Sequence, residues 1–243
     1  MLYFANMIVL DRKFKVGIND LLFSPFFLIR YYLYQSISEN AGLLNGKMLD
    51  FGCGTKPYKH LFNHVSDYIG VDFEGGGNVY EKKDVEFFYN GHQLPFDDHT
   101  FDSALATEVF EHIFNIDEIL GEINRVLKPG GRLLLTCPFL WPEHEQPWDY
   151  ARYSSFGIKA LLEKHGFRVI KQGKTGNYIV GIYQLFVLFI YYLIPKVPVL
   201  YHIAFLTITL PFSIVTGLLA IILPKKLLRK DLYLNNVLVV EKG

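Results

Sequence analysis

The stretch Met48-Leu-Asp-Phe-Gly-Cys-Gly-Thr-Lys56 decides the fold that this sequence predicts. Apolar residues lead to Asp50, a Gly-x-Gly turn follows at Gly52 and Gly54, and Pro57 opens a short helical pattern. This order predicts a β-strand, a tight turn and the start of a helix. Glycine lets the backbone adopt positive φ and lets a ligand approach where a Cβ atom would clash. The stretch is therefore either an ordinary strand-to-helix turn or one that holds a ligand, and the residues that follow favour the second.

Composition limits both the number of domains and the class of partner. A chain of 243 residues suits one large α/β domain, alone or with an appendage. Its 24 basic and 24 acidic side chains balance, which argues against nucleic acid as a partner. Cys53 and Cys137 provide neither a disulfide framework nor a metal-ligand pair, so a reducing, cytoplasmic compartment fits. The N-terminus shows no signal-peptide pattern, and apolar residues concentrate at 21–34 and 178–223.

Short apolar runs alternate with helical patterns along most of the chain. After the opening strand, further strands are expected at Tyr68–Asp72, Val85–Asn90, Phe101–Glu108, Leu133–Cys137, Phe167–Ile170 and Asn236–Val240. Helices are expected at Phe26–Ala41, at Asn115–Leu127 and after Ser154 or Ser155. Strands that alternate with helices form a parallel-dominated α/β sheet with helices on both faces.

The acid that ends the second expected strand strengthens the case for a ligand. Asp72 lies about 20 residues beyond the glycine turn, the spacing at which an acid meets ribose hydroxyls in doubly wound folds. A dinucleotide fingerprint needs a third glycine for packing of helix on strand, but here Pro57 follows Gly54 after two residues. The pattern therefore predicts a nucleoside ligand and disfavours a pyrophosphate.

Six pieces of the sequence now form an ordered set. They are Asp50-Phe-Gly-Cys-Gly54, Gly70-Val-Asp72, Leu94-Pro-Phe96, Phe101-Asp102, Glu108-Val-Phe-Glu-His112 and Arg125-Val-Leu-Lys-Pro-Gly-Gly131. Across residues 45–173 the set resembles the class I S-adenosylmethionine-dependent methyltransferases, specifically the ubiquinone/menaquinone methyltransferase-like group (methyltransferase type 11). A looser similarity, over 144–167, is to members found with cell-surface polysaccharide genes. The resemblance implies an α/β, doubly wound, seven-stranded and mostly parallel sheet with a reversed last strand, plus an apolar helical insertion before that strand.

The resemblance also implies S-adenosyl-L-methionine as the cofactor and assigns roles by position. The glycine turn would hold the methionine part, Asp72 the ribose, and Asn90-Gly91 the adenine edge. The family usually has Asp at the position of Asn90, whose amide oxygen can accept the same hydrogen bond. The full set of expected cofactor-binding residues is Asp50, Gly52, Cys53, Gly54, Asp72, Phe73, Asn90, Gly91, Leu94, Thr107 and Glu108.

Two segments after the cofactor motifs carry candidates for the chemistry. Methyl transfer depends on positioning of the acceptor, and a hydroxyl acceptor also benefits from a general base. His144 and Asp149 lie in a loop over 138–153 that is dense in aromatic and ionisable residues, and His112 follows the fourth expected strand. His144 is the preferred base, with Asp149 and His112 as the other candidates. The same loop is also consistent with an aromatic lid that carries no chemistry.

The Glu-x-x-Glu-His piece has two further interpretations. Glu108, Glu111 and His112 can ligate a divalent metal, or they can cap the next helix and line the cofactor pocket. Structural support is the favoured interpretation, and no resident metal is expected.

An apolar insertion separates the sixth strand from the last. The expected domains are an N-terminal segment with the aromatic helix (1–44), the cofactor domain (45–177 with 231–243) and the insertion (178–230). Ile179–Ile194 gives a helix of about 24 Å, short of the roughly 30 Å bilayer core. Because the last strand must rejoin the sheet, the insertion crosses a membrane twice or not at all. An in-plane or re-entrant hairpin on the inner face of the membrane is favoured over a lid, a dimer interface or a two-pass hairpin.

The expected function is O-methylation, with S-adenosylmethionine, of a lipid-linked saccharide or another amphipathic acceptor. The partners are then this acceptor and a membrane surface that contacts 179–223, and nucleic acid is not among them. The expected location is cytoplasmic, peripheral or re-entrant. Two alternatives stay open: a C- or O-methyltransferase of a quinone-like precursor, and a non-catalytic cofactor-binding scaffold for a membrane enzyme.

Overall fold

The computed structural model describes residues 24–75, 85–193 and 228–243, with positions 203, 205–209, 211–212, 215 and 222 between them. Residue contacts divide the chain into two units. One comprises Met1–Gln35 and Lys174–Leu234, and the other comprises Ser36–Gly173 and Asn235–Gly243. The second unit holds the sheet. Its boundary falls inside helix α2 (Phe27–Ala41), so this division groups part of the expected N-terminal segment with the apolar insertion.

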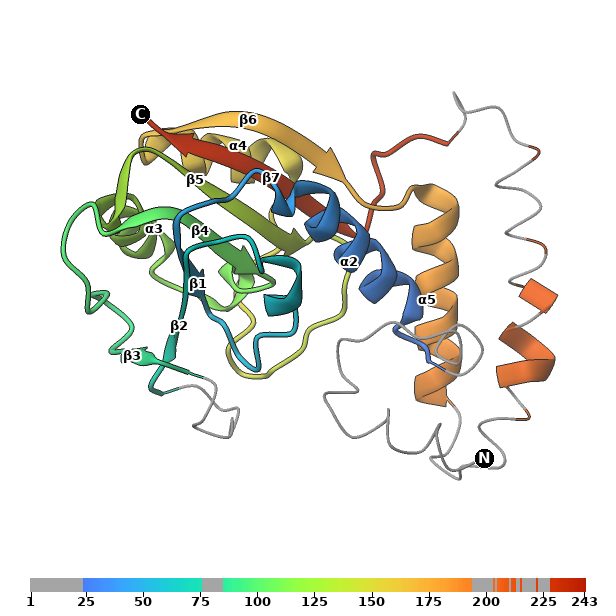
Figure 1. The fold of residues 1–243 in the computed structure, drawn as a ribbon. Helices are drawn as coiled ribbons and strands as arrows, with labels where there is room; N and C mark the ends of the chain where they lie inside the picture. Colours follow the sequence, from blue (N-terminus) through green and yellow to red (C-terminus); the bar gives the residue numbers. More distant parts are fainter. Residues whose placement is uncertain are drawn as a thin grey trace, which may run out of the picture. The chain divides into compact units, whose positions relative to one another are not determined.

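A sheet of seven described strands forms the second unit (Figure 1). In chain order the strands are β1 (Lys47–Phe51), β2 (Asp67–Phe73), β3 (Phe87–Tyr89), β4 (Phe101–Thr107), β5 (Leu127–Pro138), β6 (Phe167–Lys174) and β7 (Asn235–Lys242). Their order in the sheet is β3-β2-β1-β4-β5-β7-β6. The pairs among β1 to β5 are parallel and β5 pairs with β7 antiparallel. This topology confirms the predicted fold.

Strand direction decides which residues meet at one edge of the sheet. The carboxyl ends of β1 to β5 lie together, and ligands of open α/β sheets bind at that edge. Because β7 runs the other way, its first residue, Asn235, lies at the same edge, paired with Pro138. Arg168, early in β6, forms an ion pair with Glu241, late in β7, so β6 runs parallel to β5 and also ends there.

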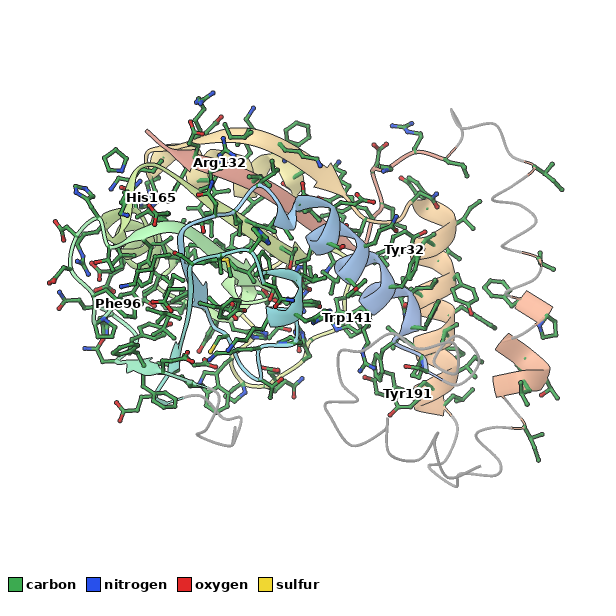
Figure 2. The ribbon with its side chains drawn as sticks, viewed as in Figure 1. Tyr32, Phe96, Arg132, Trp141, His165 and Tyr191 are labelled. Atoms are coloured by element: carbon green, nitrogen blue, oxygen red, sulfur yellow. The ribbon has the colours of Figure 1, made fainter. Side chains whose placement is uncertain are left out.

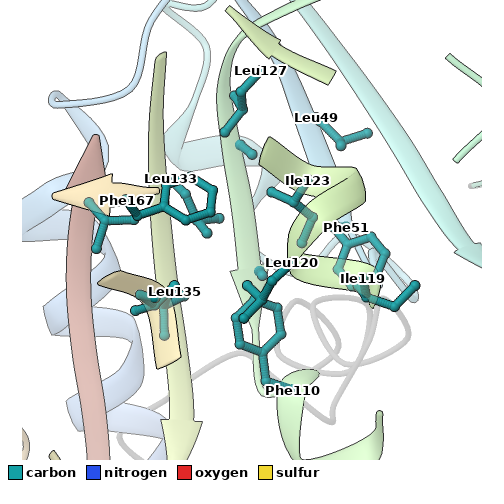
Figure 3. Packing of buried hydrophobic residues seen from close by; sticks show 14 of the residues in the cluster. Leu49, Phe51, Phe110, Ile119, Leu120, Ile123, Leu127, Leu133, Leu135 and Phe167 are labelled. Carbon is teal, nitrogen blue, oxygen red and sulfur yellow. The ribbon is translucent and has the colours of Figure 1, made fainter. Parts of the chain in front are cut away.

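Two helices cover one face of the sheet. Helix α3 (Ile116–Val126) buries Ile119, Leu120, Ile123 and Val126, which pack with Leu49, Phe51, Leu133 and Leu135 of the strands (Figure 3). Helix α4 (Ser155–Lys164) adds Ile158 and Leu162 to the same core. The apolar period of α3 therefore explains its orientation, because only one face of the helix is apolar enough to be buried.

The caps of α4 agree with its sequence signals. Ser154 accepts a hydrogen bond from Gly157 N at 3.1 Å, and Gly166 ends the element with φ +80°.

At the β3 edge, Phe96 (labelled in Figure 2) packs edge-on against Phe87 and Phe101.

Some expected elements differ from the observed ones. The helix predicted after Pro57 is only the three-residue 3-10 turn η1 (Lys59–Leu61), because Tyr58 and Phe62 are the only buried residues in 57–66 and cannot hold a longer helix on the core. Strand β3 has three residues rather than six. Strand β5 starts at Leu127 instead of Leu133, since the glycine-containing segment after Leu127 continues beside β4 with an irregular register.

The other unit contains helix α5 (Tyr178–Leu193), which corresponds to the first predicted apolar run. Asn177 caps it by accepting hydrogen bonds from Ile179 N and Val180 N. The two ends of the insertion are joined, because Leu234 N donates to Thr175 O at 2.9 Å. Within the described residues, no helix has both the length and the apolar character needed to span a bilayer. The second apolar run, 199–223, lies mostly outside those residues.

Candidate active site

The glycine turn has the backbone conformation that its sequence requires. Gly52 and Gly54 have φ of +66° and +48°. The N–H groups of Gly52 and Cys53 both donate to Val71 O, which ties the turn to the adjacent strand β2. A Cβ atom on Gly52 would lie 2.6 Å from both methyl groups of Val109. Glycine is therefore required here by the dihedral angle and by the packing together.

Asp72 lies beside this turn at the end of β2. Its Oδ2 accepts a hydrogen bond from Gly54 N at 3.0 Å, and its Oδ1 accepts one from Phe73 N at 2.8 Å. Burial raises the pKa of Asp72, the two backbone hydrogen bonds lower it, and the nearby charge of Glu145 raises it; the net direction is upward. The carboxylate is fixed and half-buried, and each oxygen keeps a lone pair for a further donor such as a ribose hydroxyl.

Asp50 is buried under the turn rather than open to a ligand. The hydroxyl of Tyr68 donates to Asp50 Oδ2 at 2.5 Å, and burial raises the pKa of Asp50 to about 7. Cys53 is also buried, which raises its thiol pKa. These two expected cofactor residues therefore support the turn from within the fold.

Lys56, at the end of the turn, had no predicted role, but its buried side chain forms an ion pair. Its Nζ contacts both oxygens of Glu86 at 2.5 Å, and Glu86 also accepts a hydrogen bond from Gly70 N. A Cβ atom on Gly70 would collide with the Lys56 side chain at 2.4 Å. The glycine in Tyr68-Ile-Gly-Val-Asp72 is the signal in the sequence for this buried lysine.

At Asn90 and Gly91, the residues expected at the adenine edge, the hydrogen bonding of the Asn90 side chain differs from the prediction. Asn90 Oδ1 accepts hydrogen bonds from His92 N and Gln93 N, so this oxygen is used within its own turn. Its amide N–H₂ group, not its oxygen, is left to meet a base edge. The exposed Phe73 ring lies 3.0 Å from where a Cβ atom of Gly91 would stand, so Gly91 makes room for that ring.

A shallow cavity of about 680 Å³ also touches this end of the sheet. Its lining includes Asn90 and Leu94 but extends to Lys47 and Thr100, which are at the amino ends of β1 and β4. It therefore lies off the carboxyl edge. Leu94 itself is buried, and its N–H donates to Glu122 Oε2.

Two buried carboxylates follow the end of β4 at Thr107. Glu108 has φ +55°, and its Oε2 accepts a hydrogen bond from Asn235 Nδ2 at 2.7 Å. Burial raises the pKa of Glu108 to about 7. Glu111 is completely buried, and neither of its carboxylate oxygens has a hydrogen-bond partner among the described residues. Burial, and then the charge of Glu108, raise the pKa of Glu111 well above its usual range.

The loop between β5 and α4 is held by an ion pair. Arg152 contacts the two oxygens of Asp149 at 2.5 and 2.6 Å and also donates to the carbonyls of Trp141 and Pro142. The loop is fastened to the end of β4 as well, because Tyr150 N donates to Glu111 O at 2.8 Å.

Asp149 does not suit the role of a base that the sequence allowed. Burial raises its pKa, but the hydrogen bonds from the Arg152 guanidinium and from His144 N outweigh burial and lower the pKa to about 2. Its carboxylate instead lies 3.1 Å from His144 Nδ1 and positions that imidazole.

The two histidines predicted as bases lie together. Their ring centroids are 4.7 Å apart in a T-shaped arrangement. His112 Nδ1 donates to Trp148 O at 2.7 Å, since a carbonyl oxygen can only accept. Burial, and then the neighbouring His112, lower the pKa of His144. His144 is therefore neutral near pH 7.

The carboxyl edge thus brings together a glycine turn, an acid held by two backbone N–H groups, and a group of carboxylates and imidazoles. A family model described as a methyltransferase domain matches residues 49–135. The O-methyltransferase rstn1 of Aspergillus nomiae is 32% identical over 162 residues, which are 57% of this chain and 72% of that protein. The chain belongs to the S-adenosylmethionine-dependent methyltransferases.

Two further comparisons agree with that membership. The methyltransferase is similar to the demethylmenaquinone methyltransferase of Symbiobacterium thermophilum, 35% identical over 92 residues, which are 36% of this chain and 34% of that one. The solved structure of an S-adenosylmethionine-dependent methyltransferase from Mesorhizobium loti shares the fold, with a TM-score of 0.51, 11% identity and coverage of 90% of this chain and 98% of that one.

The cofactor of this methyltransferase is S-adenosylmethionine, and the residues present fit it. The positive-φ glycines leave the backbone open to close approach, and the two held oxygens of Asp72 suit the ribose.

Three residues that take part in the site had no role in the sequence analysis. Asn235 reaches Glu108 only because β7 is reversed. Lys56 binds Glu86, 30 positions along the chain, and Arg152 binds Asp149 within the same loop.

Proposed function

We propose that this methyltransferase transfers a methyl group to a hydroxyl oxygen of an amphipathic acceptor, such as a lipid-linked saccharide, at a membrane surface. The observation that carries this proposal is an exposed apolar stripe on α5. The stripe consists of Tyr178, Ile182, Leu185, Phe189 and Tyr192, which are between 40 and 68% exposed. Spacings of three and four residues put them on one face of the helix.

The length and flanks of α5 suit a helix that lies in the interface. Its 16 residues include no charged side chain and extend for about 24 Å, less than a bilayer core of roughly 30 Å. Lys171 and Lys174 precede it, and Arg229 and Lys230 follow the insertion, so basic groups flank both ends. A helix of this kind buries its apolar face at the boundary between headgroups and acyl chains. We infer a peripheral position on the inner, cytoplasmic face.

An insertion at this point in the chain favours a lipidic acceptor. It departs from the end of β6 and returns to the start of β7, and both belong to the carboxyl edge. Acceptors of open α/β enzymes bind near that edge. Membrane contact through the insertion would therefore present an acceptor that is itself part of the membrane.

His144 is our candidate for the group that takes the hydroxyl proton. Asp149 Oδ2 lies 3.1 Å from His144 Nδ1, and the Arg152 guanidinium lies 3.4 Å from the same atom. In the proposed base, Nδ1 carries its proton toward Asp149 and Nε2 has the lone pair. S-adenosylmethionine supplies an electrophilic methyl group on a positively charged sulfur. The acceptor hydroxyl would lose its proton to His144 Nε2 as its oxygen bonds to the methyl carbon; the bond from that carbon to sulfur would break, its electron pair would stay on sulfur, and S-adenosylhomocysteine would leave. His112, with its tautomer fixed by Trp148, is the alternative proton acceptor.

A second candidate is methylation of a quinone-like precursor. The similarity to a demethylmenaquinone methyltransferase supports it, and such an acceptor would be methylated on carbon or on oxygen.

The substrate test uses the full-length enzyme with methyl-labelled S-adenosylmethionine and fractionated membrane lipids from the host. We expect label in an amphipathic fraction and, after hydrolysis, on the oxygen of a saccharide. Label on a quinone ring would establish the second candidate, and label confined to water-soluble metabolites would refute both.

The membrane test uses flotation with vesicles that contain anionic phospholipid. Burial of one large apolar side chain contributes about 2 kcal/mol, so Phe189→Glu should lower vesicle binding by at least about 30-fold. Phe156→Glu is the matched control, because Phe156 is an exposed phenylalanine on α4. Equal flotation of the two variants would remove α5 from the membrane contact.

A further inference from the structure

Three side chains at the carboxyl edge point their ligand atoms toward one another. Glu111, His112 and His144 each offer one such atom, and all three atoms lie within 4.8 Å of one another. His112 Nε2 is 3.8 Å and His144 Nε2 is 4.0 Å from the same Glu111 oxygen, Oε1. Tetrahedral metal–ligand bonds of about 2.0–2.2 Å place two ligand atoms about 3.3–3.6 Å apart, so one ion would draw these atoms together by about half an ångström.

The surroundings of the two imidazoles bear on which nitrogen atoms can act as ligands. His112 Nδ1 carries its proton because it donates to the Trp148 carbonyl, and its Nε2 therefore has a lone pair. His144 Nδ1 accepts a hydrogen bond from the Arg152 guanidinium at 3.4 Å and lies 3.1 Å from Asp149 Oδ2. An ion bound to His144 Nε2 would require the proton on Nδ1, where it would face the Asp149 carboxylate. A carbonyl or carboxylate behind each imidazole is the usual outer support of a metal-binding histidine.

Glu111 provides an independent observation that points to a ligand. Its side chain is completely buried, and both of its oxygens lack a hydrogen-bond partner among the described residues. An unpartnered buried carboxylate is costly unless a proton or a cation compensates for it. Arg152, the neighbouring guanidinium, is already bound to both oxygens of Asp149.

We propose that Glu111, His112 and His144 bind one divalent transition-metal ion. Two imidazoles and one carboxylate favour divalent ions of the first transition row, from Mn²⁺ to Zn²⁺, over Ca²⁺ or Mg²⁺, which prefer oxygen ligands alone. This set differs from the alternative in the sequence analysis, because Glu108 points to Asn235 and His144 takes its place. The proposal replaces our expectation of no resident metal.

Three protein ligands leave coordination positions open for a substrate oxygen. In this part the inference rests on the proposed function: a hydroxyl bound to the ion would lose its proton more readily. The two histidines would then hold the ion, and the bound hydroxyl would release its proton to solvent water, in place of the transfer to His144 described above.

The first test measures metal binding alone. Full-length enzyme is freed of metal with a chelator and titrated with MnCl₂ and ZnCl₂ by calorimetry, and the bound Mn²⁺ is observed by electron paramagnetic resonance. We expect one ion per chain. His112→Gln and His144→Gln should each lower the affinity for the metal ion by about tenfold to 100-fold. Glu143→Gln is the matched control, because Glu143 is an exposed acid next to His144, and its affinity should stay within about threefold.

Two outcomes would overturn the proposal: no ion bound to the wild-type enzyme, or unchanged affinity in both histidine variants. Glu111→Gln should also lower the affinity for the metal. If this buried substitution prevents folding, the variants of the two partly exposed histidines still test the site. Calorimetry with S-adenosylhomocysteine on the same samples reports cofactor binding separately. Loss of metal with normal cofactor binding therefore tests the site, and an enzyme that binds the ion but methylates no hydroxyl refutes only the proposed function.

Discussion

Replacement of Asp72 by alanine tests whether this carboxylate holds the cofactor. Its two oxygens are fixed by Gly54 N at 3.0 Å and Phe73 N at 2.8 Å, and each retains one lone pair. A hydrogen bond to a charged group contributes about 1.5–3 kcal/mol. We take one such bond from a ribose hydroxyl at full value, about 3 kcal/mol, which predicts an affinity for S-adenosylmethionine about 150-fold lower in the variant.

The same substitution also frees the glycine turn, and the assay separates the two effects. Calorimetric titrations compare S-adenosylhomocysteine with its 2′-deoxy analogue on wild-type enzyme and on Asp72→Ala. If Asp72 binds the ribose, the variant should lose most of the preference for the natural ligand. Glu74→Ala is the control, because Glu74 is an exposed acid two residues away.

Two results would refute this reasoning. Unchanged affinity of a folded Asp72→Ala protein for S-adenosylhomocysteine would remove Asp72 from the cofactor site. An equal loss of affinity for both ligands would mean that Asp72 acts only by holding the turn.

Three further substitutions test the support of the site. Burial raises the pKa of Asp50 in the folded protein to about 7, so the contribution of this carboxyl to stability is full below its unfolded pKa of 3.8 and is lost as the pH rises through 7. Between pH 4 and pH 8, the free energy of unfolding of Asp50→Asn, measured in urea, should therefore rise by about 4 kcal/mol relative to that of the wild type. An equal difference between the two proteins at both pH values would contradict this. Arg152→Gln should raise the pKa of Asp149 from about 2, as followed by NMR titration, and an unshifted titration would argue against the ion pair. The same substitution should lower the free energy of unfolding by about 2 kcal/mol, as measured by denaturation. Gly52→Ala, with φ +66° and a Cβ atom 2.6 Å from Val109, should lower the free energy of unfolding by at least about 1–2 kcal/mol, and a neutral result would show that the turn can shift.

Local patterns predicted the elements that depend on neighbouring residues. Helices α3 and α4 follow their apolar periods and caps to within a residue or two, because the same side chains that define the period are those that become buried. The exception near Pro57 is also local in origin, since its two buried residues were too few to support a helix. The family resemblance added the seven strands and the reversed last strand, which periodicity does not contain.

The residues of the site divide in the same way. The glycine turn and Asp72 could be found from sequence because their spacing reflects one strand, one turn and the next strand. Asp50 could not be judged, since whether an acid at a strand end faces a ligand or the core depends on the burial by Tyr68 that only packing produces.

Order and spacing along the chain determined an α/β sheet, a nucleoside ligand and the position of the apolar insertion, and the family resemblance added the cofactor and the seven-stranded fold. Only the tertiary structure decided that Asp149 is an anchor rather than a base, that Asn235 binds Glu108, and that His144 joins Glu111 and His112. The physical reason is that the charge state and contacts of a side chain depend on neighbours through space. Residues separated by more than 100 positions, such as Glu108 and Asn235, become neighbours only when a reversed strand closes the sheet.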